Sequence, residues 1–147
     1  MKRHFPGLHV GSNNGSDLLE GLFLVRVAQA SYRWHREKPF FALRFSILEP
    51  KEYVGQTLSS RLYCTPKALW KLNWFLRDFG YDNELFQRDE IDEKALLNLT
   101  GVVRTSRTTL NGRSFLNFEA FAPAGNWGEL RSAAVMAGDG EENGNDL

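Results

Sequence analysis

Two segments near the start of the chain, residues 21–34 and 39–50, alternate apolar and polar positions with the two-residue period of half-buried β-strands. The second segment places four large apolar residues on one face, which we predict to be the core face: Phe41, Leu43, Phe45 and Ile47. The first segment has a less regular parity, which a β-bulge within it would explain. Together the two segments predict a β-hairpin.

A third strand and one main helix are predicted after this hairpin. Residues 57–65 alternate apolar and polar positions, with two leucines facing inward. The Thr-Pro pair at 65–66 matches a helix N-cap and first helical position, and Gly80 matches a C-terminal stop. Between them lies one apolar stripe, formed by Leu69, Leu72, Leu76 and Phe79. Trp70 and Trp74 lie beside this stripe, and we interpret them as large core side chains rather than as a ligand-binding pair.

The clearest hairpin lies in residues 99–124, where Asn111 and Gly112 predict a two-residue type I′ turn. Counting outward from this turn gives four cross-strand pairs: Leu110 with Arg113, Thr108 with Phe115, Arg104 with Glu119, and Val102 with Phe121. This register leaves Phe115 and Phe121 on a mostly polar face. A binding surface explains them, and an edge covered by a tail or loop explains them equally well.

Three strands, a helix and a two-stranded hairpin form the element order of the oligonucleotide-binding (OB) fold, a small five-stranded barrel with its helix between strands three and four. We therefore predict an all-β OB-fold domain with one main helix over residues 21–125, and 147 residues allow one such domain. Residues 1–20, rich in Gly, Ser and Asn, are expected to be flexible. Residues 126–147 are expected to form an acidic, disordered tail.

The net charge of zero hides a segregated pattern. Residues 21–77 hold ten Lys or Arg against three Glu, a local balance of +7. Residues 82–93 carry six acids and one Arg, and residues 138–147 carry four acids and no base. A positive surface accompanied by an acidic tail is one consistent interpretation, and a solvated face or chain end is the alternative for each cluster.

The predicted loop between the first two strands, SYRWHREKPF at residues 31–40, interleaves aromatic and basic side chains. In the OB fold, the outer faces of strands two and three bind single strands or sugars, together with the loops that join strands one to two and four to five. Aromatic rings there would stack on unpaired bases, and cations would follow the phosphates. The candidate nucleic-acid-binding residues are Tyr32, Arg33, Trp34, Arg36, Lys38, Arg44, Arg61, Tyr63, Arg104 and Phe115.

Several motifs between residues 21 and 123 carry a resemblance to a known family: GLFLVRV, the basic hairpin tip, YVGQTL, KALWKLNWFLRDFG, and LTGVVRT with NGRSFLNF. The pattern is similar to a family of small phage and mobile-element proteins related to single-stranded DNA-binding proteins. The resemblance implies an OB barrel and a role near replication or recombination, with no catalytic residue. This chain departs from familiar bacterial single-strand binders in its tail, which ends Asn145-Asp146-Leu147 without a terminal phenylalanine.

Catalytic motifs are absent from the sequence, which has no Walker loop, no dinucleotide-binding glycine run and no GxSxG. Cys64 and His35 could form a nucleophile and base, but the inward position expected for Cys64 favours an inert core thiol. The acids within residues 89–93 could bind a divalent cation, although a solvated face is favoured. We therefore predict a protein that is not an enzyme and has no cofactor or metal.

Two hypotheses of different class remain. The favoured one is a single-stranded DNA-binding protein, for which the sequence does not distinguish DNA from RNA; replication or recombination proteins would dock through the acidic tail, and a homo-oligomer is compatible. The alternative is an OB-fold module that binds a protein through its exposed aromatic residues. A single cysteine, and no apolar run long enough for a signal peptide or a membrane span, predict a cytoplasmic protein without membrane contact.

Overall fold

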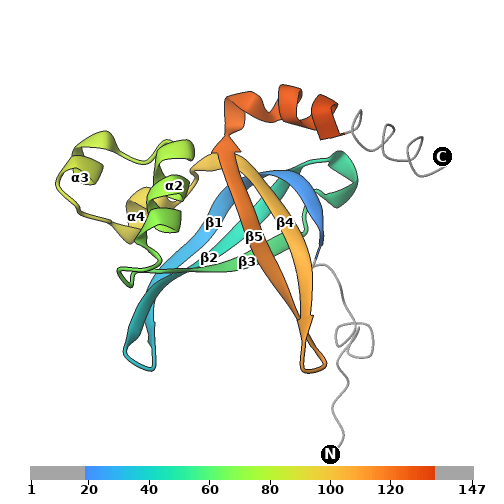
Figure 1. Cartoon of the computed structure of the whole chain (residues 1–147). Helices are drawn as coiled ribbons and strands as arrows, with labels where there is room; N and C mark the ends of the chain where they lie inside the picture. Colours follow the sequence, from blue (N-terminus) through green and yellow to red (C-terminus); the bar gives the residue numbers. More distant parts are fainter. Residues whose placement is uncertain (1–18, 135–147) are drawn as a thin grey trace, which may run out of the picture.

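The computed structural model describes residues 19–134, which form a mostly β structure with a few short helices (Figure 1). These residues contain five strands: β1 (Gly21–His35), β2 (Lys38–Glu49), β3 (Thr57–Tyr63), β4 (Thr100–Leu110) and β5 (Arg113–Pro123). Three helices lie between β3 and β4, namely α2 (Leu69–Asp78), α3 (Asn83–Gln87) and α4 (Glu93–Leu96). The predicted order of three strands, a helix and a hairpin is thus confirmed for the described residues.

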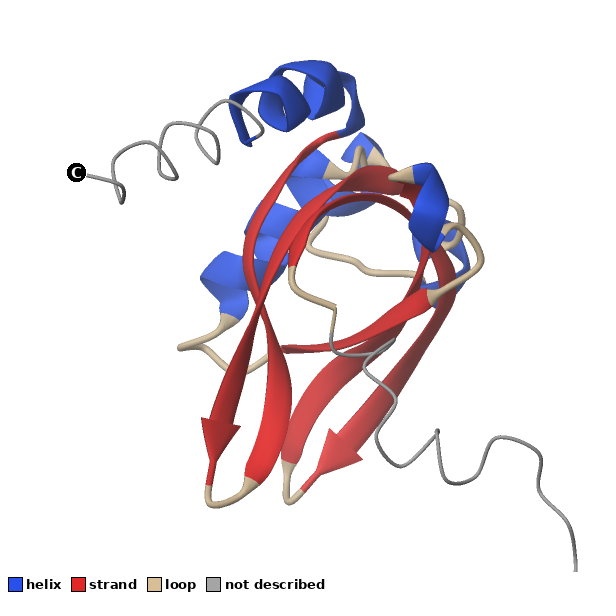
Figure 2. Ribbon diagram, turned by 90° about the vertical axis from the view of Figure 1, so that its right-hand side faces the viewer, coloured by secondary structure: helices blue, strands red, loops and turns tan. Residues whose placement is uncertain are grey.

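The five strands form one antiparallel sheet in the order β3-β2-β1-β4-β5. Figure 2 shows that the sheet is strongly curled. The β1–β2 and β4–β5 hairpins extend in the same direction, and their tips lie at the opposite end of the molecule from the helical segment over residues 127–134 (Figures 1 and 2). The two hairpin tips therefore project from the same end of the curled sheet.

The core lies inside the curl of the sheet and under α2. The four predicted core positions of β2 are all buried, as are the two inward leucines of β3. Five phenylalanines pack at the centre with neighbouring ring centroids 4.6–6.1 Å apart: Phe45, Phe75, Phe79, Phe118 and Phe121. Aromatic pairs at such separations stabilise a core beyond the apolar area that they bury, by about 0.5–1.5 kcal/mol each. The burial of these positions confirms that the alternation in the sequence identifies the core faces of β2 and β3.

The irregular parity of β1 results from a β-bulge, as predicted. The register with β2 shifts between Val27 and Gln29, which leaves Ala28 as the extra residue. Before the bulge, odd-numbered residues face the core. After it, the even-numbered residues Ala30 and Tyr32 pair with Leu43 and Phe41, which belong to the core. The bulge therefore decides which side chains of the β1 tip face each side of the sheet.

The predicted turn between β4 and β5 is confirmed. Asn111 and Gly112 have φ values of 53° and 78°, the positive values that a type I′ turn requires. The pairs Leu110–Arg113 and Thr108–Phe115 also form as predicted. The turn chemistry therefore fixes the register over the distal half of the hairpin.

The predicted register is wrong in the half of the hairpin nearer the core, because Glu119 is an extra residue in a second bulge. The observed pairs are Arg104 with Ala120 rather than Glu119, and Val102 with Ala122 rather than Phe121. This shift turns Phe121 to the opposite face, where it is buried against α2. Of the two phenylalanines expected on the polar face, Phe115 alone remains there.

Helix α2 begins later than predicted. Its N-cap is Ala68, whereas the Thr65 carbonyl accepts backbone hydrogen bonds from Ala68 and Leu69 in the preceding turn, at 2.9 and 3.1 Å. Gly80 ends the helix as predicted, with a φ of 74° that is accessible to glycine without strain. Three of the four predicted stripe residues are buried, but Leu69 is exposed and Phe75 is buried instead. The buried face is thus rotated from the predicted one.

Beyond β5 the chain continues as a 3₁₀ turn, η3 (Ala124–Asn126), and a helical segment over residues 127–134. Residues 126–134 were assigned above to the tail, yet Trp127 is buried. The predictions for residues 1–18 and 135–147 lie outside the described residues. Within residues 19–134, no helix has the length and apolar content needed to cross a membrane.

Candidate nucleic-acid interface

The outer side of β1, β2 and β3 carries three arginines close together. Arg44 pairs with Gln29 on β1 and with Ser59 on β3, and cross-strand partners share one face of a sheet. The same register places Arg33 and Arg61 on this face, because they alternate with residues that face the core. We call this surface the basic face and define it by Gln29, Ser31, Arg33, Ala42, Arg44, Ser59 and Arg61.

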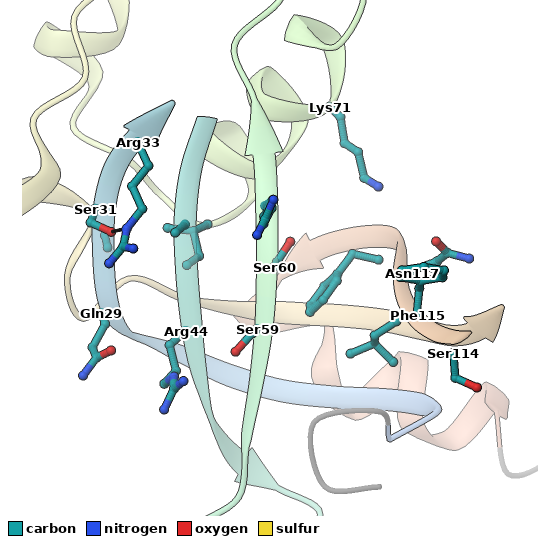
Figure 3. Close-up of a pocket in the computed structure, with 16 residues that line it drawn as sticks. Gln29, Ser31, Arg33, Arg44, Ser59, Ser60, Lys71, Ser114, Phe115 and Asn117 are labelled. Atoms are coloured by element: carbon teal, nitrogen blue, oxygen red, sulfur yellow. Dashed lines mark hydrogen bonds between the residues drawn. The ribbon is translucent and has the colours of Figure 1, made fainter. Parts of the chain in front are cut away.

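The basic face forms one wall of an open groove of about 810 Å³ (Figure 3). The facing wall is residues 114–118 of β5, and Lys71 projects from α2 toward the groove. Four cations therefore line it: Arg33, Arg44, Arg61 and Lys71. None of the described lining residues is Asp or Glu. The groove is thus electrostatically suited to an anion longer than a single phosphate.

Neighbouring side chains position two of the arginines. The Nε of Arg33 donates a hydrogen bond to Oγ of Ser31 at 2.9 Å. The guanidinium carbon of Arg61 lies 4.9 Å from the ring centroid of Phe40, a cation–π contact. Within residues 19–134, none of the three arginines of the basic face has an ion pair with an acid. The described residues therefore neutralise none of the three charges, and they hold those of Arg33 and Arg61 in place.

Lys71 differs from the arginines because it is partly desolvated. Burial lowers the pKa of Lys71 below its ordinary value, and the negative charge of Glu119 acts in the opposite direction. A phosphate placed in the groove would favour the charged form of this lysine, as any nearby anion does. Ligand binding and protonation of Lys71 are therefore coupled.

Of the ten candidate residues, four line the groove: Arg33, Arg44, Arg61 and Phe115. Phe115 is 47% exposed and lies on the β5 wall, across from the arginines. Tyr63 shares the outer face but packs against Phe40, with ring centroids 5.2 Å apart, and is half-buried. The structure thus brings one exposed ring and three predicted cations into a single groove.

Tyr32 and Trp34 lie on the other side of the sheet. They pair with Phe41 and Pro39 of β2, and the Tyr32 ring contacts the core residue Phe41 at a centroid distance of 5.2 Å. Both rings are exposed, and Trp34 is 63% exposed. Because residues alternate along the strand, the loop that interleaves rings and cations places them on opposite faces. The structure therefore does not combine these two rings with Arg33 in one surface.

The remaining candidates, Arg36, Lys38 and Arg104, do not line the groove. Arg36 and Lys38 are exposed at the tip of the β1–β2 hairpin. Arg104 is exposed on β4, where it pairs with Leu22 and Ala120. These three cations contribute to the local charge rather than to the wall of the groove.

Seven polar residues of the groove were not among the candidates: Gln29, Ser31, Ser59, Ser60, Lys71, Ser114 and Asn117. Gln29 and Ser31 could have been found by applying the reversed parity after the bulge in β1. No comparable signal in the sequence indicates Lys71. Tertiary packing, and not the periodicity of the helix, determines which strands a helix covers.

The interpretation of both helix tryptophans as core side chains is wrong for Trp70, which is 63% exposed. Trp74 is half-buried: its ring meets Phe121 edge-on at 5.7 Å, and its Nε1 donates a hydrogen bond to Asp78 at 2.8 Å. Trp70 stacks against Trp74 with ring centroids 6.3 Å apart and planes inclined by 28°. An exposed aromatic surface therefore lies on α2, the helix that carries Lys71.

The other groups considered from the sequence lie away from this groove. Burial raises the pKa of the Cys64 thiol, which disfavours its nucleophilic thiolate form. The Tyr81 hydroxyl donates to the Glu90 carbonyl at 3.0 Å and accepts from the Asp92 N–H at 2.9 Å, so it fixes the acidic loop. Within residues 19–134, no group of three His, Cys, Asp or Glu side chains could hold a metal ion.

No family model matches the chain, and no curated protein matches it. The interpretation of the groove therefore depends on its own chemistry: four cations, uncharged polar side chains and one exposed phenyl ring.

Proposed function

We propose that this protein is a non-catalytic single-stranded DNA-binding protein whose curled sheet is an OB-fold barrel. The observation that carries this proposal is the alignment of Arg33, Arg44, Arg61 and Lys71 along one groove, with Phe115 exposed on the facing wall. The helix placed between β3 and β4, and the two hairpins beside the groove, support the barrel. The sequence resemblance supports an accessory role in replication or recombination of a mobile element.

The mechanism combines phosphate neutralisation with base stacking. Cations along the groove release the counterions of the strand, which provides affinity without sequence preference. The Phe115 ring can stack only on a base whose face is free, so it favours a single strand over a duplex. The uncharged lining residues, such as Gln29 and Asn117, can hydrogen-bond to any base or sugar. We therefore expect weak sequence preference and tighter binding to single strands.

The test is the salt dependence of binding to a fluorescently labelled oligonucleotide. Four phosphate contacts at about −0.7 each predict a slope of about −2.8 for log affinity against log salt. A duplex of the same length should bind more weakly, and an RNA strand of the same sequence reports any preference for the sugar. A flat salt response, or equal affinity for single strand and duplex, would contradict the proposal.

A protein-binding module is the second candidate, favoured by the exposed Tyr32 and Trp34 on the side of the sheet away from the cations. Exposed aromatic residues are common anchors of protein interfaces. This alternative predicts no oligonucleotide binding at low salt, where the electrostatic attraction of the groove is strongest. The titration described above therefore distinguishes the two functions.

A further inference from the structure

We propose that the nucleic-acid path continues from the groove onto helix α2, where Trp70 forms a second base-stacking platform. This inference depends on the proposed function, because it extends the same binding surface. Lys71 connects the groove with the platform, because its side chain lines the groove and Trp70, the residue before it, carries the exposed indole.

Trp74 supports one face of the Trp70 ring. Trp74 is fixed by its hydrogen bond to Asp78 and by its edge-on contact with Phe121 of the core. Trp70 stacks on Trp74, so one of its faces is packed while most of the ring stays exposed to solvent. A ring already held in place loses little freedom when a base stacks on it, which favours binding.

The surroundings of the ring fit a nucleic acid better than a purely apolar partner. Trp70 shares a shallow hollow with Leu69, Asn73, Trp74 and Arg77. The hollow thus combines stacked rings with the Arg77 cation, and Lys71 follows on the side of the groove. Aromatic rings interleaved with cations are the combination that binds single strands without sequence preference. Because Trp70 of the hollow and Lys71 of the groove are consecutive residues of α2, we assign the hollow to the same nucleic-acid strand.

The decisive measurement is the dependence of affinity on oligonucleotide length. Oligothymidylates of about 4 to about 16 nucleotides cover the range of sites bound by single OB folds. Full-length wild-type protein, Trp70→Ala and Val54→Ala are titrated with each length by fluorescence anisotropy. Val54 is a matched control, because it is an apolar residue with 57% exposure that lies outside the groove and the hollow. Thermal unfolding confirms that each variant is folded.

We expect the shortest strands, which occupy the groove alone, to bind wild type and Trp70→Ala equally. Longer strands should bind Trp70→Ala about 5-fold to about 150-fold more weakly, the range for one lost base stack. Trp70→Phe should retain part of this affinity, and Val54→Ala should match wild type. Arg77→Gln should reduce the magnitude of the salt slope by about 0.7, for long strands only.

Three results would overturn the platform. If Trp70→Ala binds every length as wild type does while Arg44→Gln weakens binding, the groove functions without it and the proposed function stands. An equal loss at all lengths would indicate an indirect effect on the groove. If wild type binds no oligonucleotide at low salt, the proposed function fails, and the platform fails with it.

Discussion

Exposed rings near the two hairpin tips have different roles according to the face they occupy. Phe115 and Trp34 are both exposed rings, but Phe115 lines the groove whereas Trp34 pairs with Pro39 on the opposite side. Phe115→Ala should therefore weaken oligonucleotide binding by about 1–3 kcal/mol through loss of one stack. Trp34→Ala should change it by no more than about 0.5 kcal/mol, as for an ordinary surface substitution. Anisotropy titrations of both variants measure the contrast, and a larger loss for Trp34→Ala would place the strand on the other face.

The protonation of Lys71 gives the groove a pH dependence. Because burial lowers its pKa, Lys71 loses its charge at a lower pH than exposed lysines do, and binding should weaken as the pH rises toward the ordinary lysine value of about 10.4. Lys71→Arg keeps its charge throughout this range, so this variant should retain its affinity at alkaline pH. Affinity measured against pH for both proteins tests this, and parallel curves would exclude Lys71 from the interface.

The titration of Lys71 should change stability in the opposite direction to binding: as the pH rises, binding weakens but the folded protein becomes more stable. Between its lowered pKa and its ordinary pKa, the unfolded chain binds more protons at this position than the folded protein does. The contribution of Lys71 to the free energy of unfolding therefore increases as the pH rises through that window. Unfolding measured without ligand separates this effect from the loss of binding.

At the scale of elements, α2 packs against β4 through a contact that requires glycine. A Cβ built on Gly101 would lie 2.4 Å from the ring of Phe79, which is buried at the end of α2. Gly101→Ala should therefore lower the free energy of unfolding by about 1–3 kcal/mol through overpacking. Gly125→Ala is the matched control, because its Cβ would meet nothing within 4 Å. Denaturant titrations measure both, and equal stabilities would mean that the ring moves away at no cost.

The sequence predicts elements well where local chemistry determines them. Asn111 and Gly112 specify their turn, and alternation identifies the core face of β2. The sequence does not predict the features that depend on tertiary packing. Nothing near Glu119 marks a bulge, and the bulge alone sends Phe121 into the core. The exposure of Trp70 likewise depends on which side of α2 meets the sheet. Four of the ten candidate residues line the groove, and Tyr32 and Trp34 do not because the face on which a side chain lies, and not its residue type, decides what lines the groove.

On the scale of the whole molecule, the curl of the sheet brings β3 and β5, its two ends in strand order, to opposite walls of one groove. The residues that meet there come from β1, β2, β3, α2 and β5. No short motif could have revealed this grouping, because residues 29 and 118 are brought together by the fold alone. The local charge balance did indicate it, since all four cations fall within the basic stretch of residues 21–77.

The bulge at Ala28 affects how this surface can change in evolution. A substitution in the tip of β1 alters one side of the hairpin at a time. An insertion of one residue between Ala28 and Tyr32 would exchange the two sides for every residue after it, because the side-chain period of a strand is two. The two exposed rings would then face the groove, and Arg33 would leave it, with almost no change in composition. The gain or loss of one codon can therefore replace a phosphate-binding surface by an aromatic one.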